Sequence, residues 1–302
     1  MGRIARGEYV SGHNRALILG ATGMLGHEVV RRFAAAFDVH ATARDPATAE
    51  RFGLPVTLHR LDAAELSTLD ELFGRVAPRV VVNCIGIVKQ LDEGSRPIPT
   101  ITVNALFPHY VAAAARKTGA RVIHVSTDCV FSGDLPLQRA YAEDDFADAR
   151  DLYGLTKLLG EIRSPDLTVR TSIIGWELTR STGLLEWFAA RRGEEVGGFT
   201  NALFSGLTTR ALADVLLDVS IRYPELAGLY HVSSAPISKH ALLTMIDERL
   251  RLDVRITPID HPVVNRVLDS RRFRADTGIS VPPWDEMLDA YLADRSPREA
   301  PA

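Results

Sequence analysis

The stretch LILGATGMLGHEVV (17–30) joins an apolar run to a helical pattern through three closely spaced glycines. A tight turn, a close approach of the backbone to a pyrophosphate, and packing of a helix on a strand each require a residue without a side chain. A packing turn can use the same residues, and the spacing is GxxGxxG rather than GxGxxG, but the place between a strand and a helix is typical of a dinucleotide site. The residues expected to contact the cofactor here are Gly20, Thr22, Gly23, Met24, Leu25 and Gly26.

Apolar runs of strand length alternate with helical patterns through the first half of the chain. Such alternation predicts a parallel sheet covered on both faces. Helices are expected at 27–37 and 102–119, the second with a kink at Pro108 and with Gly119 as its C-cap. The expected strands are 15–20, 39–44, 55–62, 79–86, 121–127 and 167–175. We therefore expect an α/β fold, a Rossmann-like doubly wound parallel sheet with a smaller helix-rich C-terminal substrate region.

The second half is less regular. A strand is expected at 228–234, and helices at 183–193, 208–224 and 238–250, the last with Ser238 as its N-cap. The predicted division of the chain is an N-terminal extension (1–14), an NAD(P)-binding domain (15–175 plus 199–233), a substrate-binding region (176–198 plus 234–295) and a flexible tail (296–302).

The composition excludes several classes of function. The 302 residues include 35 basic and 38 acidic ones, so the chain lacks the basic surplus of a nucleic-acid-binding protein. No run of 18 apolar residues predicts a membrane span, and the first fourteen residues lack the apolar core of a signal peptide. The two cysteines, Cys84 and Cys129, lie in apolar contexts, which predicts neither a disulfide nor a metal site. We expect a cytoplasmic protein, and a homodimer is one assembly that the sequence leaves open.

The segment ATARD (41–45) ends the second expected strand, where dinucleotide-binding proteins choose between NAD and NADP. Arg44 favours NADPH because an arginine there accommodates the 2′-phosphate, while Asp45 leaves NADH possible. A solvated Arg–Asp pair is the alternative reading. Asp62, which closes the third strand, is expected either to bind the adenine or to start a turn.

Hydroxyl, phenol and ammonium groups follow the fifth expected strand. Ser126 and Thr127 alternate on that strand, so one of the two faces the crevice, and we expect it to be Thr127. Tyr153 and Lys157 are one helical turn apart, although a plain surface pair would show the same spacing. A free phenol has a pKa of about 10. We expect Lys157 to lower the pKa of Tyr153, so that Tyr153 can protonate a carbonyl oxygen held by Thr127.

These motifs resemble the extended short-chain dehydrogenase/reductase family. STDCVFSG, YAEDD, YGLTKLLGE and VRTSIIG are most similar to its dTDP-4-dehydrorhamnose reductase branch. The resemblance implies reduction of the 4-keto group of a nucleotide-linked 6-deoxyhexose, with Thr127, Tyr153 and Lys157 as catalytic residues. It places Lys157 on the nicotinamide ribose as well, Asn83 and Gly86 on the cofactor, and the nucleotide-sugar in the C-terminal region. The residues implied to bind substrate are Asn104, Asp128, Cys129, Ile173 and Trp176.

Two positions depart from that branch. Cys129 and Ile173 stand where the reductases commonly carry a tyrosine and a tryptophan that line the sugar pocket. If the strand stays extended past Thr127, Cys129 shares its face and borders the sugar. Cys129 also replaces the glutamate with which related 4,6-dehydratases eliminate water, so we expect no dehydration. A 4-epimerase that retains its NAD is an alternative, as is a regulatory subunit that binds NADP, like the β subunit of methionine adenosyltransferase.

Overall fold

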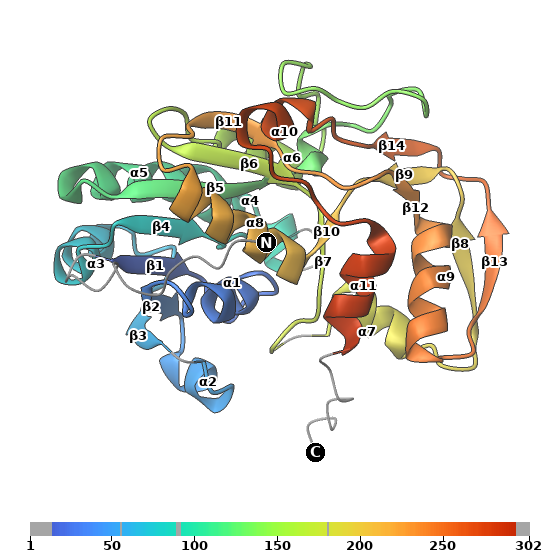
Figure 1. Ribbon diagram of the computed structural model, residues 1–302, viewed down its shortest axis with the longest axis horizontal. Coiled ribbons are helices and arrows are strands. Elements are labelled where there is room, and N and C mark those ends of the chain that lie inside the picture. Colours follow the sequence, from blue (N-terminus) through green and yellow to red (C-terminus); the bar gives the residue numbers. More distant parts are fainter. Residues whose placement is uncertain (1–13, 55, 89–91, 180, 294–302) are drawn as a thin grey trace.

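The central element is a seven-stranded parallel sheet (Figure 1). The computed structural model describes residues 14–54, 56–88, 92–179 and 181–293. The sheet has the order β11-β6-β5-β4-β1-β2-β3, so the chain changes direction between the neighbouring strands β1 and β4, where ligands bind in such folds. Its strands are β1 (Arg15–Leu19), β2 (Asp38–Ala43), β3 (Thr57–Arg60), β4 (Val80–Asn83), β5 (Arg121–Thr127), β6 (Leu167–Thr171) and β11 (Gly228–His231). The predicted fold class is confirmed.

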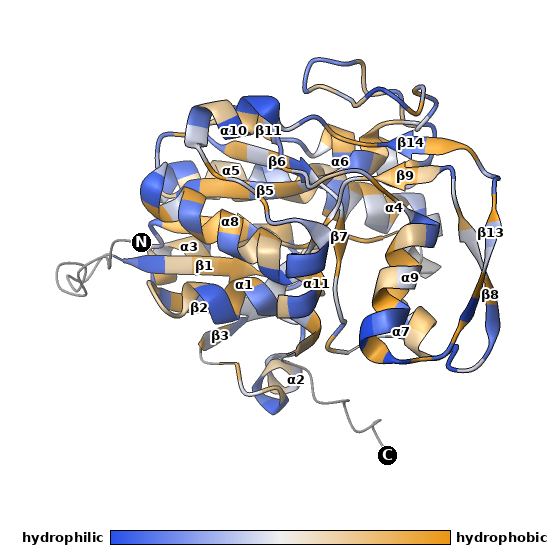
Figure 2. Cartoon of the chain, turned by 45° about the vertical axis from the view of Figure 1, so that its right-hand side comes forward, coloured by the Kyte–Doolittle hydropathy of each residue, from blue (hydrophilic) through white to orange (hydrophobic). Residues whose placement is uncertain are grey.

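Helices bury apolar side chains on both faces of this sheet. On one face, α1 (Gly26–Phe33) and α8 (Thr209–Arg222) pack Phe33 and Leu212 into the same core as Ile18 of β1. On the other, α3 (Leu69–Val76) and α5 (Phe107–Thr118) pack Phe73 and Val111 with Leu17 and Leu19. The alternation along β1 explains how one strand serves two cores, and β1 is hydrophobic over most of its length (Figure 2).

The helix expected at 102–119 has two parts. A π-helical turn, η3 (Ile101–Leu106), follows α4 (Pro97–Thr100) and leads into α5. Pro108 is the second residue of α5 and directly follows this π-helical turn, so the irregularity lies in the turn before the proline, where a proline removes a helical hydrogen bond. Gly119 ends α5 with φ +71°, as predicted for its C-cap.

The remaining elements form a smaller region beside the carboxyl ends of the main strands (Figure 1). Ser238 accepts a hydrogen bond from the Ala241 N–H at 3.1 Å and is the N-cap of α9, as predicted. Three short sheets were not predicted: β9 (Ala202–Phe204) with β12 (Ile237–Ser238) and β14 (Val264–Arg266), β8 (Glu195–Phe199) with β13 (Arg255–Ile259), and β7 (Ile173–Ile174) with β10 (Leu207–Thr208). The helices here are α7 (Leu184–Ala189), α9 (Lys239–Leu250) and α11 (Trp284–Ala293), whereas α10 (Arg271–Thr277) packs beside β11 of the main sheet.

Several connections carry short helices: α2 (Pro46–Arg51), η1 (Leu66–Thr68), η2 (Asp92–Ser95), η4 (Asp128–Val130) and α6 (Leu152–Leu159). The predicted domain boundaries stay predictions. Apart from Asn14, the expected N-terminal extension lies outside the described residues, as does the expected tail.

Candidate active site

A cleft of about 510 Å³ opens at the carboxyl ends of the sheet strands, beside the change of strand direction. It runs from the glycine loop past the ends of β4 and β5 to the start of α6 and the segment 171–184. The predicted site residues that line it are Gly20, Thr22, Gly23, Met24, Leu25, Arg44, Asp62, Gly86, Thr127, Asp128, Cys129, Tyr153, Lys157 and Ile173. The structure therefore brings most of the sequence motifs to one cavity.

Two glycines of the loop, Gly20 and Gly26, leave no room for a side chain. Gly20 has φ +89°, and its N–H donates to the Thr42 hydroxyl at 3.1 Å. A Cβ on Gly26 would lie 1.9 Å from the Gly20 carbonyl oxygen, so this glycine allows α1 to pack against the end of β1 rather than lining the cleft. The start of α1 has no side-chain cap. A backbone cradle at a helix N-terminus fits the pyrophosphate of a dinucleotide.

Three charged residues follow strands β2 and β3, and they differ in whether they face the cleft or bind the protein backbone. The Asp45 carboxylate caps α2, accepting hydrogen bonds from the Ala47 N–H at 3.1 Å and the Thr48 hydroxyl at 2.6 Å. Arg44 is exposed and lines the cleft. Asp62 also lines it, while accepting the Ala64 N–H at 2.9 Å in a turn. Arg44 is thus presented to a ligand, whereas Asp45 is engaged by the protein.

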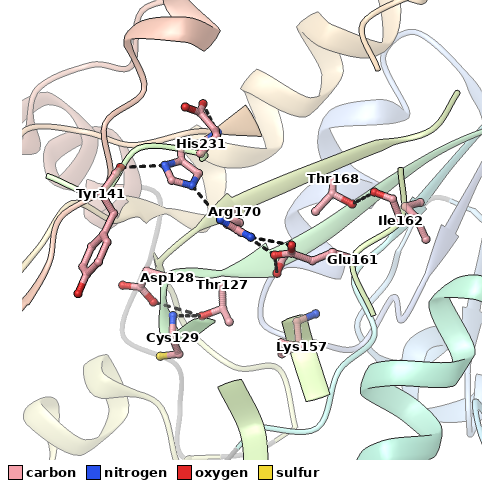
Figure 3. Close-up of polar contacts among 12 residues, drawn as sticks. Thr127, Asp128, Cys129, Tyr141, Lys157, Glu161, Ile162, Thr168, Arg170 and His231 are labelled. Atoms are coloured by element: carbon pink, nitrogen blue, oxygen red, sulfur yellow. Dashed lines mark hydrogen bonds and ion pairs between the residues drawn. The ribbon is translucent and has the colours of Figure 1, made fainter. Parts of the chain in front are cut away.

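Strand β5 ends at Thr127, which shapes the next turn. Its hydroxyl oxygen accepts the Cys129 N–H at 3.1 Å and caps η4, so the chain does not stay extended as the sequence argument assumed. Asp128 and Cys129 lie next to the Thr127 hydroxyl in this turn (Figure 3), and both nevertheless line the cleft. Burial raises the pKa of the Asp128 carboxyl, although the charges of Arg266 and Lys239 oppose the rise.

Tyr153 is half-buried at the start of α6, in the same cleft as Thr127. Burial raises the pKa of the Tyr153 phenol, and the nearby Cys129, Asp128 and Asp151 add to the rise, while a hydrogen bond with Thr127 opposes it. The predicted lowering of this pKa by Lys157 is therefore wrong for this structure, because desolvation and negative neighbours dominate. A raised pKa keeps the phenol protonated, which is the state that donates a proton.

Lys157 is buried, with its side chain directed at strand β5. Its Nζ donates to the Val125 carbonyl oxygen at 2.7 Å. Burial lowers the pKa of Lys157 to about 8, and the negative charge of Glu161 opposes this most strongly. Burial also raises the pKa of Cys84, beside the cleft, to about 12, so that this thiol stays neutral.

Two predicted asparagines support the cleft without lining it. Asn83 accepts the Ile85 N–H at 3.1 Å, and its amide meets Nδ1 of His124 at 3.1 Å. Asn104 accepts the Ile87 N–H and donates to the Ile87 carbonyl, both at 2.8 Å. Both residues thus fix the loop after β4, which carries Gly86. Trp176 is likewise outside the lining, and its backbone N–H donates to the Tyr291 hydroxyl at 2.7 Å.

The sequence analysis missed two features. Glu177 and Thr182 line the cleft, and the Glu177 carboxylate accepts the Thr182 N–H at 2.7 Å and the Gly183 N–H at 3.1 Å, which closes this loop on itself. The second is a buried ion pair between Glu161 and Arg170, to which Ser126 donates a hydrogen bond at 2.9 Å (Figure 3). An arginine inside the apolar strand LTVRT was the available signal, because a buried charge requires a partner.

In the part of the chain that the structure describes, no group of three or more His, Cys, Asp or Glu side chains could hold a metal ion. No helix there is both long and apolar enough to cross a membrane.

Comparisons with known proteins agree with this architecture. Residues 14–296 match the family described as the RmlD substrate binding domain. The chain is 27% identical to the spore coat polysaccharide biosynthesis protein SpsK of Bacillus subtilis, over 93% of this chain and 98% of that protein. It is 28% identical to the dTDP-4-dehydrorhamnose reductase of Salmonella typhimurium, over 89% of this chain and 94% of that protein. The structure of dTDP-4-dehydrorhamnose reductase from Bacillus anthracis in complex with NADP shares the fold, with a TM-score of 0.78 at 21% identity over 94% of this chain and 100% of that one.

Proposed function

Because the chain belongs to the RmlD substrate binding domain family, we propose that it reduces the 4-keto group of a nucleotide-linked 6-deoxyhexose with NADPH. The observation that carries this proposal is a single cleft with two ends. The glycine loop forms one end, and Thr127, Tyr153 and Lys157 meet at the other. A dinucleotide laid along such a cleft presents its nicotinamide where the phenol stands.

The proposed chemistry divides among three side chains. NADPH, when bound, supplies hydride to the carbonyl carbon. Thr127 holds the carbonyl oxygen by a hydrogen bond, and Tyr153 donates its proton to that oxygen. The positive charge of Lys157 stabilises the phenolate that Tyr153 becomes. A positioned acid of this kind contributes roughly 10²–10⁴-fold to the rate.

The proposed preference for NADPH over NADH rests on the two residues between the end of β2 and the start of α2. Discrimination between the two cofactors depends on the ribose 2′ position, which a carboxylate binds as a hydroxyl and an arginine binds as a phosphate. Asp45 is engaged in capping α2, whereas Arg44 faces the cleft. We therefore propose that Arg44 binds the 2′-phosphate.

The sugar is proposed to differ from 4-keto-rhamnose. Cys129 and Ile173 both line the cleft, and each is smaller and less polar than the residue common in the reductases it resembles. A pocket tuned to one set of hydroxyls discriminates strongly, because a mismatched sugar leaves polar groups unpaired. The cytoplasmic location and the homodimer stay predictions.

The test is NADPH oxidation against 4-keto-6-deoxyhexoses linked to dTDP, GDP, UDP and CDP. We expect oxidation with one of them, and loss of most of that turnover in Tyr153→Phe. Tyr110→Phe removes a phenolic hydroxyl from an exposed tyrosine of α5 that does not line the cleft, and it is the matched control. Cofactor that stays bound while a sugar epimerises would favour a 4-epimerase, and tight cofactor binding without turnover would favour a regulatory subunit.

A further inference from the structure

We infer that Glu161 is a positioning residue of this site, whose carboxylate, fixed by Ser126 and Arg170, keeps the Lys157 ammonium charged. The inference rests on the proposed function, since it concerns how the supporting cation of that reaction is maintained. Glu161 ends the YGLTKLLGE segment but does not line the cleft, and neither observation by itself gives it a role.

Lys157 and Glu161 form hydrogen bonds with consecutive residues of β5. The Lys157 ammonium donates to the Val125 carbonyl oxygen at 2.7 Å. The hydroxyl of the next residue, Ser126, donates to Oε1 of Glu161 at 2.9 Å. Glu161 also follows Lys157 by four positions, just after the end of α6. Ammonium and carboxylate are therefore held against the same short piece of strand.

The Glu161 carboxylate is itself held in one place. Arg170 on β6 donates two hydrogen bonds to this carboxylate, from Nε at 2.7 Å and from Nη2 at 2.8 Å (Figure 3). Both side chains are almost wholly buried. The Arg170 guanidinium lies 5.2 Å from the centre of the Phe131 ring and 3.5 Å from the His231 imidazole. A bidentate pair fixes the direction of both planar groups. The Glu161 carboxylate thus cannot move without breaking several hydrogen bonds.

Other groups around Lys157 do not supply the negative charge. The thiol of Cys84 is neutral at physiological pH, since burial raises its pKa to about 12. His124 on β5 is neutral, because burial and the Lys157 charge lower its pKa well below the usual range. His231, which lies beside Arg170, is neutral as well, because burial and the Arg170 charge lower its pKa to about 3. Tyr153 stays protonated. Glu161 is therefore the carboxylate among these neighbours that opposes the desolvation of Lys157.

The inference predicts how the protonation of Lys157, and with it the activity, depends on pH. Lys157 carries its charge below its pKa of about 8 and loses it above. Without Glu161, burial acts unopposed, so the charge is lost at a lower pH. An opposite charge nearby is worth about one pH unit or more in a lysine pKa. The alkaline limb of kcat/KM should move by the same amount.

The experiment titrates Lys157 directly. The chain contains four lysines, so ¹³C-labelled lysine gives few NMR signals, and a Lys157→Arg variant assigns the one of interest. In Glu161→Gln we expect the midpoint of Lys157 to fall by about one pH unit or more. The exposed Lys117, paired with Asp70, should not move and is the internal reference. Glu248→Gln, on the exposed side of α9, is the matched control.

In Glu161→Gln the Arg170 charge stays buried without its partner, which destabilises the fold. A second variant controls for this effect. Glu161→Gln with Arg170→Gln replaces both charged groups with neutral amides, and Arg170→Gln alone is its reference because it keeps the Glu161 carboxylate. If Glu161 acts on Lys157, the midpoint and the kcat/KM limb of the double variant lie at lower pH than those of Arg170→Gln. If the pair is merely structural, the two variants have the same midpoint, and this result would overturn the inference.

The titration is made without substrate, so it tests the role of Glu161 independently of the proposed reduction of a keto sugar. An unchanged Lys157 midpoint in both variants refutes the role of Glu161, whatever the turnover. A shifted midpoint in a chain that reduces no keto sugar upholds the electrostatic link and refutes the proposed reaction.

Discussion

Replacement of Gly26 by alanine tests how the glycine loop is built. The added Cβ would lie 1.9 Å from the Gly20 carbonyl oxygen and 2.8 Å from its carbon, where ordinary contact begins at 3.4 Å. The obstacle is backbone, which cannot rotate aside as a side chain can. Either α1 or the end of β1 must therefore move by about 1.5 Å to restore ordinary contact.

Overpacking of this kind costs typically about 1–3 kcal/mol. With an unfolding entropy of about 2.1 cal/mol/K per residue, each kcal/mol lowers the Tm of this 302-residue chain by roughly 1.6 °C, so we expect a fall of about 2–5 °C. NADPH affinity should fall as well, because the same shift moves the N-terminus of α1 away from the phosphates. Differential scanning calorimetry measures the first effect and isothermal titration calorimetry the second.

Two other glycines serve as controls. A Cβ on Gly23 would meet the Gly20 oxygen at 3.3 Å, so Gly23→Ala should leave Tm nearly unchanged and weaken NADPH binding alone, since Gly23 lines the cleft. Gly74 is exposed on α3, and a Cβ there meets nothing within 4 Å, so Gly74→Ala should raise stability by about 0.5–1 kcal/mol. A Gly26→Ala protein with unchanged Tm and unchanged affinity would refute the reasoning.

Three further variants test the site. Tyr153→Phe should lower kcat by roughly 10²–10⁴-fold with NADPH affinity nearly intact, because it removes only the proton donor; near-normal turnover would end its catalytic assignment. Arg44→Ala removes a charge-assisted pair worth about 1.5–3 kcal/mol and should weaken NADPH binding about ten- to a hundredfold while leaving NADH unchanged; equal losses in calorimetric titrations would make Arg44 structural. Cys129→Tyr with Ile173→Trp should raise kcat/KM for dTDP-4-keto-rhamnose, which we expect to be a poor substrate; efficient reduction by the unaltered chain would contradict this.

The main sheet could be predicted because its signals are local. Each buried strand is a short apolar run, and Gly119 and Ser238 end and begin helices through their own backbone or side chain. The small sheets could not be predicted in the same way. Strand β8, for example, is paired with β13, so Glu195 meets Arg255 from a distant part of the chain, and neither segment is apolar throughout. Their strand conformation depends on the partner.

The cleft residues were predictable as a set, whereas their electrostatics were not. Motif spacing placed Thr127, Tyr153 and Lys157 together, and they line one cleft. The pKa of Tyr153 is governed by how deeply the phenol is buried and by which acids face it, and neither is visible in a spacing. The same holds for Glu161, whose importance comes from contacts with two separate strands.

The most direct test of the proposed reaction uses NADPH that carries deuterium at both positions of the nicotinamide C4, with the keto sugar that the substrate screen identifies. Hydride transfer predicts a product sugar that is heavier by one deuterium, located at its C4, with one NADP⁺ formed for each sugar reduced. A Tyr153→Phe protein should form this product far more slowly. A product without deuterium, or no product from any of the four nucleotide-linked sugars, would contradict the account.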